Sequence, residues 1–443
     1  MNKLEQNWNF RKLFKFAMPS ILMMLFLSIY TIVDARFVAV YVGDEAIAAI
    51  NIIYPFVSII LAIAFMVTAG SNAYISKLLG ENKNHKAREK FTFIVVIMIV
   101  FGLLLSIFGI MKSEMILTLL HSSKGIYPYA KIYLFYFSLF IIPNLLMILY
   151  QSFFITSGLP KLGLICTVAS GIINVVLDYL FIAILGYGIF GAIIATGIGY
   201  SFSAVVGTIY FFRNKKGNLS FVKFSFDLKM LTKSLTNGSS EMVSNASIAI
   251  TTYIFNGMMI KYVGDSGVAA ISIILYIQFV QVAIFFGYSS GVAPVVGYAY
   301  GAKDYNEIKK LLNIAVKFTI SVSIIVFLIS ELFTGQIVSL FFKAGTKTYE
   351  VTYLGLKIFS ISYLFAGINI YLSSFFTSLS NGKVSVVLSF IRTFIFIISM
   401  LYILPKYYGL VGVWIATPIA ELFSLIVGIV VLIKQNKNYH YFK

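Results

Sequence analysis

Residues 41–50 read YVGDEAIAAI, and residues 262–271 read YVGDSGVAAI. The second stretch repeats the first at an offset of 221 positions. The same offset places Gly70 on Gly291, Gly80 on Gly301, and Ile194-Ala195-Thr196 on Ile415-Ala416-Thr417. One constant offset across half of the chain indicates a tandem duplication. The fold should therefore consist of two similar halves.

The composition places both halves in a lipid bilayer. Of the 443 residues 60% are hydrophobic and 11% charged, and the mean hydropathy is +0.93, whereas soluble domains carry roughly 25% charged residues. The apolar runs are long and continuous, which favours membrane helices over a closed barrel. We predict twelve spans, near 13–40, 47–77, 90–112, 125–157, 160–183, 188–212, 229–262, 267–298, 309–331, 348–378, 382–404 and 409–434.

The basic residues set the expected orientation. The net charge is +18, and the Lys and Arg residues lie in the connections between spans, so they indicate a membrane topology and not a nucleic-acid partner. The central connection alone carries Arg213, Lys215, Lys216, Lys223, Lys229 and Lys233. We therefore expect both termini in the cytoplasm of a bacterium, with the chain crossing the cytoplasmic membrane many times.

This topology gives the domain organisation. Since 221 residues contain an even number of spans, the halves share one orientation and form a parallel repeat. We predict an all-α protein with an N-terminal lobe of six helices at 1–212, a cytoplasmic linker at 213–228, and a C-terminal lobe of six helices at 229–443. A substrate path should run between the two lobes.

Several function classes find no support in the sequence. The single Cys166 lies in an apolar run, so neither a disulfide framework nor a thiolate metal site is possible. The chain shows no phosphate-binding loop, metal cluster or nucleophile–base set. We therefore predict a transporter and not an enzyme, acting as a monomer with no cofactor. We predict no cleavable signal peptide, because residues 1–15 are polar and basic and a full-length span follows.

Ionisable residues inside spans are costly, which makes them candidates for function. In the first lobe Asp34 lies about two turns from the outer end of span one, and Asp178 lies at a similar depth in span five. Asn174 precedes Asp178 by one turn and shares its helix face. Thr196 lies about two turns into span six, at the same level. Two carboxylates, an amide and a hydroxyl at one depth suit Na⁺ or a shared H⁺.

The second lobe carries different charges, Glu241, Arg392 and Glu421, each near the middle of its span. We expect Arg392 and Glu421 to form a structural ion pair, because an unpaired charge is too costly there. Glu241 lies in the polar stretch 238–241 and is a candidate for contact with a cationic substrate. Lone amides in spans usually join helices; we group Asn245, Gln278 and Gln281 with Glu241 as candidate residues of the substrate cavity.

At these positions the sequence resembles the multidrug and toxic compound extrusion (MATE) family of antiporters. The resemblance covers essentially the whole chain and rests on the two six-span halves and on the segments 33–34, 41–43, 174–178, 191–196, 238–241 and 418–421. It implies a V-shaped pair of bundles that export small cationic amphiphiles by alternating access against inward H⁺ or Na⁺. It also implies that Asp34, Asn174, Asp178 and Thr196 bind the coupling ion.

Departures from the family pattern leave alternatives open. A branch of the family uses deeper acids in spans seven and ten, but here the span-seven position near Ile248 is apolar and Glu350 lies only at the edge of span ten. A lipid-linked saccharide flippase of the same superfamily would favour a cationic groove, and this chain has few bases inside its spans. A major-facilitator transporter also has six plus six spans, but the loop 77–90 does not contain the Gly-Asp-Arg-rich motif that is usual after span two in that class. A channel or a receptor is a further alternative.

Overall fold

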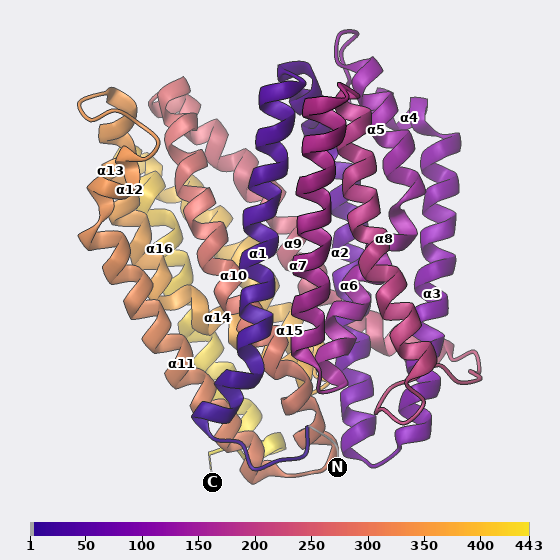
Figure 1. Cartoon of the computed structure of the whole chain (residues 1–443). Helices are drawn as coiled ribbons and strands as arrows, with labels where there is room; N and C mark the ends of the chain where they lie inside the picture. Colours follow the sequence, from indigo (N-terminus) through magenta and orange to yellow (C-terminus); the bar gives the residue numbers. More distant parts are fainter. Residues whose placement is uncertain (1–3, 443) are drawn as a thin grey trace.

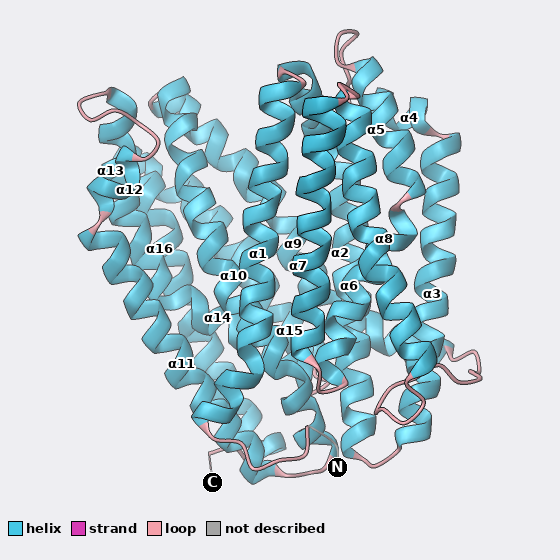
Figure 2. Cartoon of the chain, in the orientation of Figure 1, coloured by secondary structure: helices cyan, strands magenta, loops and turns pink. Residues whose placement is uncertain are grey.

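The computed structural model describes residues 4–442 of the chain, and every regular element in that range is helical (Figure 2). The first half contains α1 (Phe10–Tyr41), α2 (Asp44–Gly80), α3 (Asn84–Met111), α4 (Ser113–Leu119), α5 (Tyr127–Leu139), α6 (Ile141–Thr156), α7 (Pro160–Asp178), η1 (Tyr179–Ile184) and α8 (Gly188–Arg213). The second half contains α9 (Leu228–Tyr262), α10 (Asp265–Gly301), α11 (Tyr305–Leu332), α12 (Thr334–Ser339), α13 (Lys347–Phe359), η2 (Ser360–Ser362), α14 (Tyr363–Ser378), α15 (Gly382–Phe390), η3 (Ile391–Ile397) and α16 (Ile398–Tyr439).

These helices account for the twelve predicted spans over residues 4–442. Nine stretches are long and apolar enough to cross a membrane one by one, and α5 with α6 makes a tenth that bends by 54°. The stretch Gly382–Tyr439 has 58 residues, about 87 Å of helix at 1.5 Å per residue, and Gly409 interrupts it with φ 55°. It therefore counts as two spans. The twelfth is α9, whose 35 residues include the polar run 237–241.

The predicted spans miss several breaks. Phe140 separates α5 from α6, where one continuous span was expected, and η2 interrupts the predicted span 348–378. A π-helical turn occurs once in each lobe, at η1 and at η3. Asp178 is the last residue before η1, and Arg392 is the second residue of η3. Such turns often mark functional positions, and here each accompanies a buried charge.

Two six-helix lobes lie side by side and come closest at the end of the molecule where both termini lie (Figure 1). Helix α1 packs against α7 in its own lobe and against α10 of the other. Helix α2 packs against α9 and α10. These four helices, α1, α2, α9 and α10, make most of the contact between the lobes, so the path predicted between the lobes is bounded by them.

Glycine pairs make this contact symmetric. A Cβ on Gly80 would lie 2.0 Å from the carbonyl oxygen of Tyr298, and a Cβ on Gly301 would lie 2.0 Å from that of Lys77. Both pairs are related by the offset of 221. In the same way, α9 meets α2 at Gly238 and Gly70, where an added Cβ would come within 1.8 Å of the facing backbone. The duplication in sequence therefore corresponds to a two-fold relation between the lobes in the structure. At the four glycines named here, a Cβ would collide with the facing backbone.

The connection between the lobes is held against the first lobe. Lys90 in α3 forms an ion pair of 2.8 Å with Asp227, and Arg88 donates a hydrogen bond of 2.6 Å to the carbonyl of Gly217. The rings of Phe91 and Phe221 stack beside them. The segment 214–227 is therefore a strap on α3, and the second lobe begins directly after it, where the Asp227 side chain caps α9.

Candidate functional site

Asp34 and Asp178 meet inside the first lobe. Asp178 ends α7 and is fully buried, whereas Asp34, in the outer half of α1, is partly exposed. The two carboxyl groups lie close enough to interact strongly. A carboxylate offers only hydrogen-bond acceptors, and two negative charges close together in a buried site repel each other, so the pair favours a proton on one group or a cation between them. The pair is therefore a place where one positive charge is needed.

Asn174 and Thr196 complete the cluster. Asn174 lies one turn before Asp178, and its Nδ2 donates to the Thr196 Oγ1 at 3.2 Å. The Oδ1 of Asn174 accepts no hydrogen bond. The same holds for both carboxylate oxygens of Asp178 and for the Oδ1 of Asp34. Buried oxygens without donors are costly. They are the ligands that a hard monovalent cation prefers, so the residues present fit Na⁺ and also fit a shared H⁺.

Three tyrosines surround this cluster and were not among the predicted site residues. Tyr30 and Tyr200 line the same small cavity, and Tyr30, Tyr133 and Tyr200 all lie within electrostatic range of Asp34. Tyr30 and Tyr200 could have been found from helical spacing, because each lies four positions from a predicted residue, Asp34 or Thr196. Tyr133 comes from α5 and has no such signal.

A larger cavity, of about 70 Å³, lies between the lobes. Its wall combines apolar side chains with hydroxyls and amides from both lobes: Met23, Met24, Phe65, Thr68, Ala69, Asn72, Ala73, Ile148, Gln151, Ser152, Ile155, Glu241, Phe286, Ser290, Ala293, Ser374, Thr377 and Ser378. Glu241 is the only charged residue in that wall. Within residues 4–442 its carboxyl group takes part in none of the ion pairs.

The other predicted cavity residues do not share this wall. The amide of Asn245 donates to the carbonyl of Glu241 in its own helix at 2.8 Å, which turns it away from the cavity. Gln278 and Gln281 lie more than two turns before Ser290, the nearest polar wall residue of α10, and Gln281 is 2% exposed. None of these three is among the residues that line this cavity, and their grouping with Glu241 in substrate contact stays a prediction.

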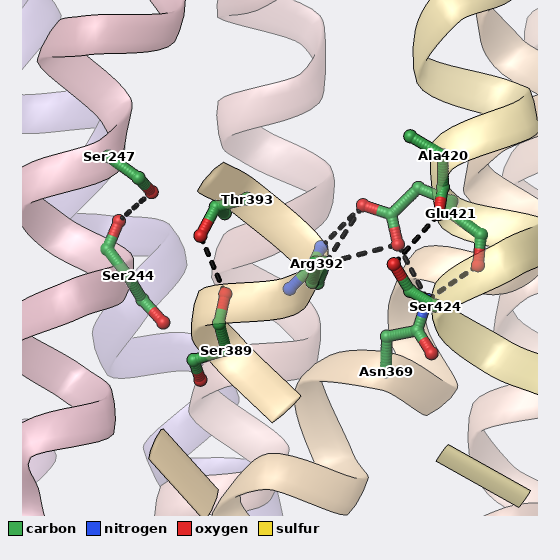
Figure 3. A network of polar contacts seen from close by, with 9 residues as sticks. All are labelled: Ser244, Ser247, Asn369, Ser389, Arg392, Thr393, Ala420, Glu421 and Ser424. Carbon is green, nitrogen blue, oxygen red and sulfur yellow. Dashed lines mark hydrogen bonds and ion pairs between the residues drawn. The ribbon is translucent and has the colours of Figure 1, made fainter. Parts of the chain in front are cut away.

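Arg392 and Glu421 form an ion pair in the second lobe (Figure 3). The Nη2 and Nε of Arg392 lie 2.7 and 2.9 Å from the Glu421 Oε1. Asn369 adds hydrogen bonds from its Nδ2 to the Oε2 of Glu421, at 2.7 Å, and to its carbonyl oxygen, at 2.9 Å. The Glu421 side chain is only 1% exposed. The carboxylate of Glu421 is therefore paired, unlike the two carboxyl groups of the first-lobe cluster.

Comparisons with known proteins agree with this architecture. The MatE family model matches residues 19–180 and 242–403, one match in each lobe. The multidrug export protein MepA of Staphylococcus haemolyticus is 24% identical over 428 residues, covering 94% of this chain and 92% of that protein. Among solved structures, a mutant of the Vibrio cholerae MATE transporter VcmN is 20% identical, with a TM-score of 0.91 and 98% of each chain covered. An outward-facing MATE family transporter is also 20% identical, with a TM-score of 0.92 over 99% of this chain and 98% of that one.

Proposed function

Because this chain belongs to the MatE family, we propose that it is a secondary active exporter that couples the inward movement of H⁺ or Na⁺ to the export of small cationic amphiphiles. The observation that carries the proposal is the donor-free oxygen cluster around Asp34 and Asp178. It takes up one positive charge at a site separate from the cavity between the lobes. An antiporter needs two such sites, one for the ion and one for the substrate.

Helix α1 connects the two sites. Asp34 lies in its outer half, Met23 and Met24 line the cavity, and Ala17 packs against Gly291 of the other lobe. Uptake of an ion compensates one of the two negative charges, which lowers the repulsion between Asp34 and Asp178 and removes a reason for α1 and α7 to separate. Any resulting shift of α1 reaches the cavity and the lobe contact directly. Protonation or Na⁺ binding at Asp34 and Asp178 therefore biases which lobe arrangement is preferred.

The lining of the cavity suits a cation, although its volume of about 70 Å³ is below the about 300–1,000 Å³ of pockets that hold drug-sized ligands. A substrate of that size therefore requires the lobes to move apart. Met23, Met24, Phe65 and Phe286 supply flexible or aromatic surface that adapts to different shapes. Glu241 supplies one negative charge without a competing base. A lipid-linked saccharide would bring phosphate into this acidic cavity, so the flippase alternative is disfavoured.

The lobe contact indicates which side of the cavity is closed in this arrangement. The lobes come closest at the end of the molecule that carries both termini (Figure 1). With the termini in the cytoplasm, the cavity is closed toward the cytoplasm in this arrangement. The available driving force is sufficient, because one pH unit supplies about 1.4 kcal/mol per proton and 100 mV about 2.3 kcal/mol per charge.

Ethidium efflux from proteoliposomes tests the proposal, with pH and Na⁺ gradients imposed separately. Wild-type protein should respond to at least one gradient, and Asp34→Asn and Asp178→Asn should each lose that response. Gln435→Glu, at the exposed cytoplasmic end of α16, serves as a control for a change in charge. Transport by both aspartate variants with the wild-type ion dependence would remove the cluster from the mechanism.

A further inference from the structure

We propose that Glu421 and Thr417 belong to a second cation site, the counterpart of the first-lobe cluster, and that the guanidinium of Arg392 permanently occupies it as a tethered cation. The inference goes beyond the proposed function, because it concerns a lobe to which no coupling ion was assigned. It implies that only the first lobe exchanges an ion during transport.

The two-fold relation gives the position. In the first lobe Thr196 and Tyr200 line a small cavity together with Asn174. At the offset of 221 their counterparts on α16 are Thr417 and Glu421. Glu421 thus brings a carboxylate to a place where the first lobe has a phenol. The acid in the second lobe lies within α16, whereas Asp178 of the first lobe lies at the end of α7.

A second observation indicates a cation ligand at this place. Thr417 lies one turn before Glu421 on the same face of α16 and is 1% exposed. Its Oγ1 has no hydrogen-bond partner. A buried hydroxyl without a partner is costly, and here it faces the same way as the carboxylate. Glu421 and Thr417 therefore offer three oxygens on one helix face, as an oxygen-coordinated cation requires.

An exchange of side-chain sizes makes room for the tethered cation. In the first lobe Gly171 lies under the ring of Phe26, where an added Cβ would approach the ring to 2.4 Å. Their counterparts in the second lobe are Arg392 and Ser247. In the first lobe the large side chain, Phe26, is on the first helix. In the second lobe the large side chain, Arg392, is on the fifth span, and the first helix, α9, carries Ser247 where the first lobe has the phenyl ring. Because α9 packs against η3, a small Ser247 leaves space that a phenyl ring would fill.

The guanidinium supplies the Glu421 carboxylate with the positive charge that an exchangeable cation would supply, and it leaves the Thr417 Oγ1 without a donor. It donates two hydrogen bonds to Glu421 Oε1, at 2.7 and 2.9 Å, and a third to Oε2 at 3.1 Å (Figure 3). An arginine stays charged at every pH at which the protein folds. The Arg392 side chain is 17% exposed, so a small ion can reach the place that it would vacate.

Thermal unfolding of the purified full chain tests this inference, using Na⁺ and free guanidinium at millimolar concentration as probes. Every variant is also made with Asp34→Asn, so that ion binding in the first lobe does not contribute. Arg392→Ala should unfold several degrees lower than its parent and should recover part of that loss, saturably, when either cation is added. Arg392→Lys keeps a tethered cation and should show no such recovery, and neither should Arg392→Ala combined with Glu421→Gln, which removes the carboxylate.

Equal insensitivity of Arg392→Ala and the double variant to both cations would overturn the inference. If Arg392→Ala does not fold, Arg392→Met replaces it in the test, because methionine preserves more of the side-chain volume. The inference then requires that Arg392→Met shows the same cation dependence. The outcome is separate from that of the proposed function. Loss of ion-driven efflux in Asp34→Asn tests the first lobe, whereas cation-dependent unfolding in the Asp34→Asn background tests only the second.

Discussion

The two lobes share one frame but treat buried charge in opposite ways. The first lobe brings Asp34 and Asp178 into contact and leaves four oxygens around them without donors. The second lobe surrounds Glu421 with Arg392 and Asn369, so its carboxylate is fully compensated. The difference teaches that a duplicated scaffold can keep its helix contacts while one copy leaves buried carboxylate oxygens without donors and the other pairs its carboxylate with its own side chains.

The largest contrast should appear in stability. Arg392→Met leaves Glu421 buried without its partner and should cost about 3–5 kcal/mol, as for other broken buried ion pairs. Asp178→Asn should cost little or stabilise the protein, because it removes one of two carboxylates in contact and adds a donor. Detergent thermal unfolding of both variants measures this difference. A similar loss in both would mean that the lobes do not differ in charge compensation.

The glycine contacts provide a second comparison, in which the lobes should behave alike. Gly80→Val and Gly301→Val each drive a side chain against the facing backbone, at Tyr298 or Lys77. Overpacking of this kind costs about 1–3 kcal/mol. Both variants should lower ethidium efflux and the unfolding temperature to a similar extent. A large effect from only one of them would mean that the two-fold relation does not extend to this contact.

Glu241 should affect substrate choice and leave ion coupling intact. Glu241→Gln removes the only charge of the cavity wall and should raise KM for a cationic substrate about tenfold, since a hydrogen bond to a charged group contributes about 1.5–3 kcal/mol. A neutral substrate of similar size should be affected much less. Transport assays with a matched cationic and neutral pair measure the ratio. An equal rise in KM for both would assign Glu241 a structural role.

The smallest effect concerns the strap between the lobes. The hydrogen bond from Lys90 holds the pKa of Asp227 below its ordinary value. A carboxyl group with a lowered pKa stabilises the fold above its unfolded pKa, and this contribution disappears as the pH falls through the folded pKa. Lys90→Met should cost less than about 1 kcal/mol at neutral pH and nothing at strongly acid pH. A loss that does not depend on pH would mean that the ion pair is not the cause.

The sequence predicts the frame of this protein well, because the frame depends on local properties. Apolar runs locate the spans, and the repeat of Gly70 and Gly80 as Gly291 and Gly301 locates residues that the structure places at the lobe contact. The residues Asp34, Asn174, Asp178 and Thr196 could be grouped because helical depth and spacing place them at one level. Their role as an ion site stays a prediction.

Other features depend on how helices are rotated against each other, which hydropathy does not report. Asn245 lies only one turn from Glu241, yet its amide bonds to its own helix and not to the cavity. Tyr133 reaches the first-lobe cluster from α5, far away in sequence. The π-helical turns at η1 and η3 also have no signal in the apolar pattern, although Asp178 directly precedes the first and Arg392 lies in the second.

The central claim is that the first lobe carries the exchangeable ion and the second does not. The most direct test compares Asp178→Asn with Arg392→Lys in proteoliposomes and measures how ethidium efflux depends on an imposed pH or Na⁺ gradient. The account predicts that efflux by Asp178→Asn no longer depends on the gradient, whereas Arg392→Lys keeps the wild-type dependence. Gradient-driven efflux by Asp178→Asn, or its loss in a folded Arg392→Lys protein, would contradict the account.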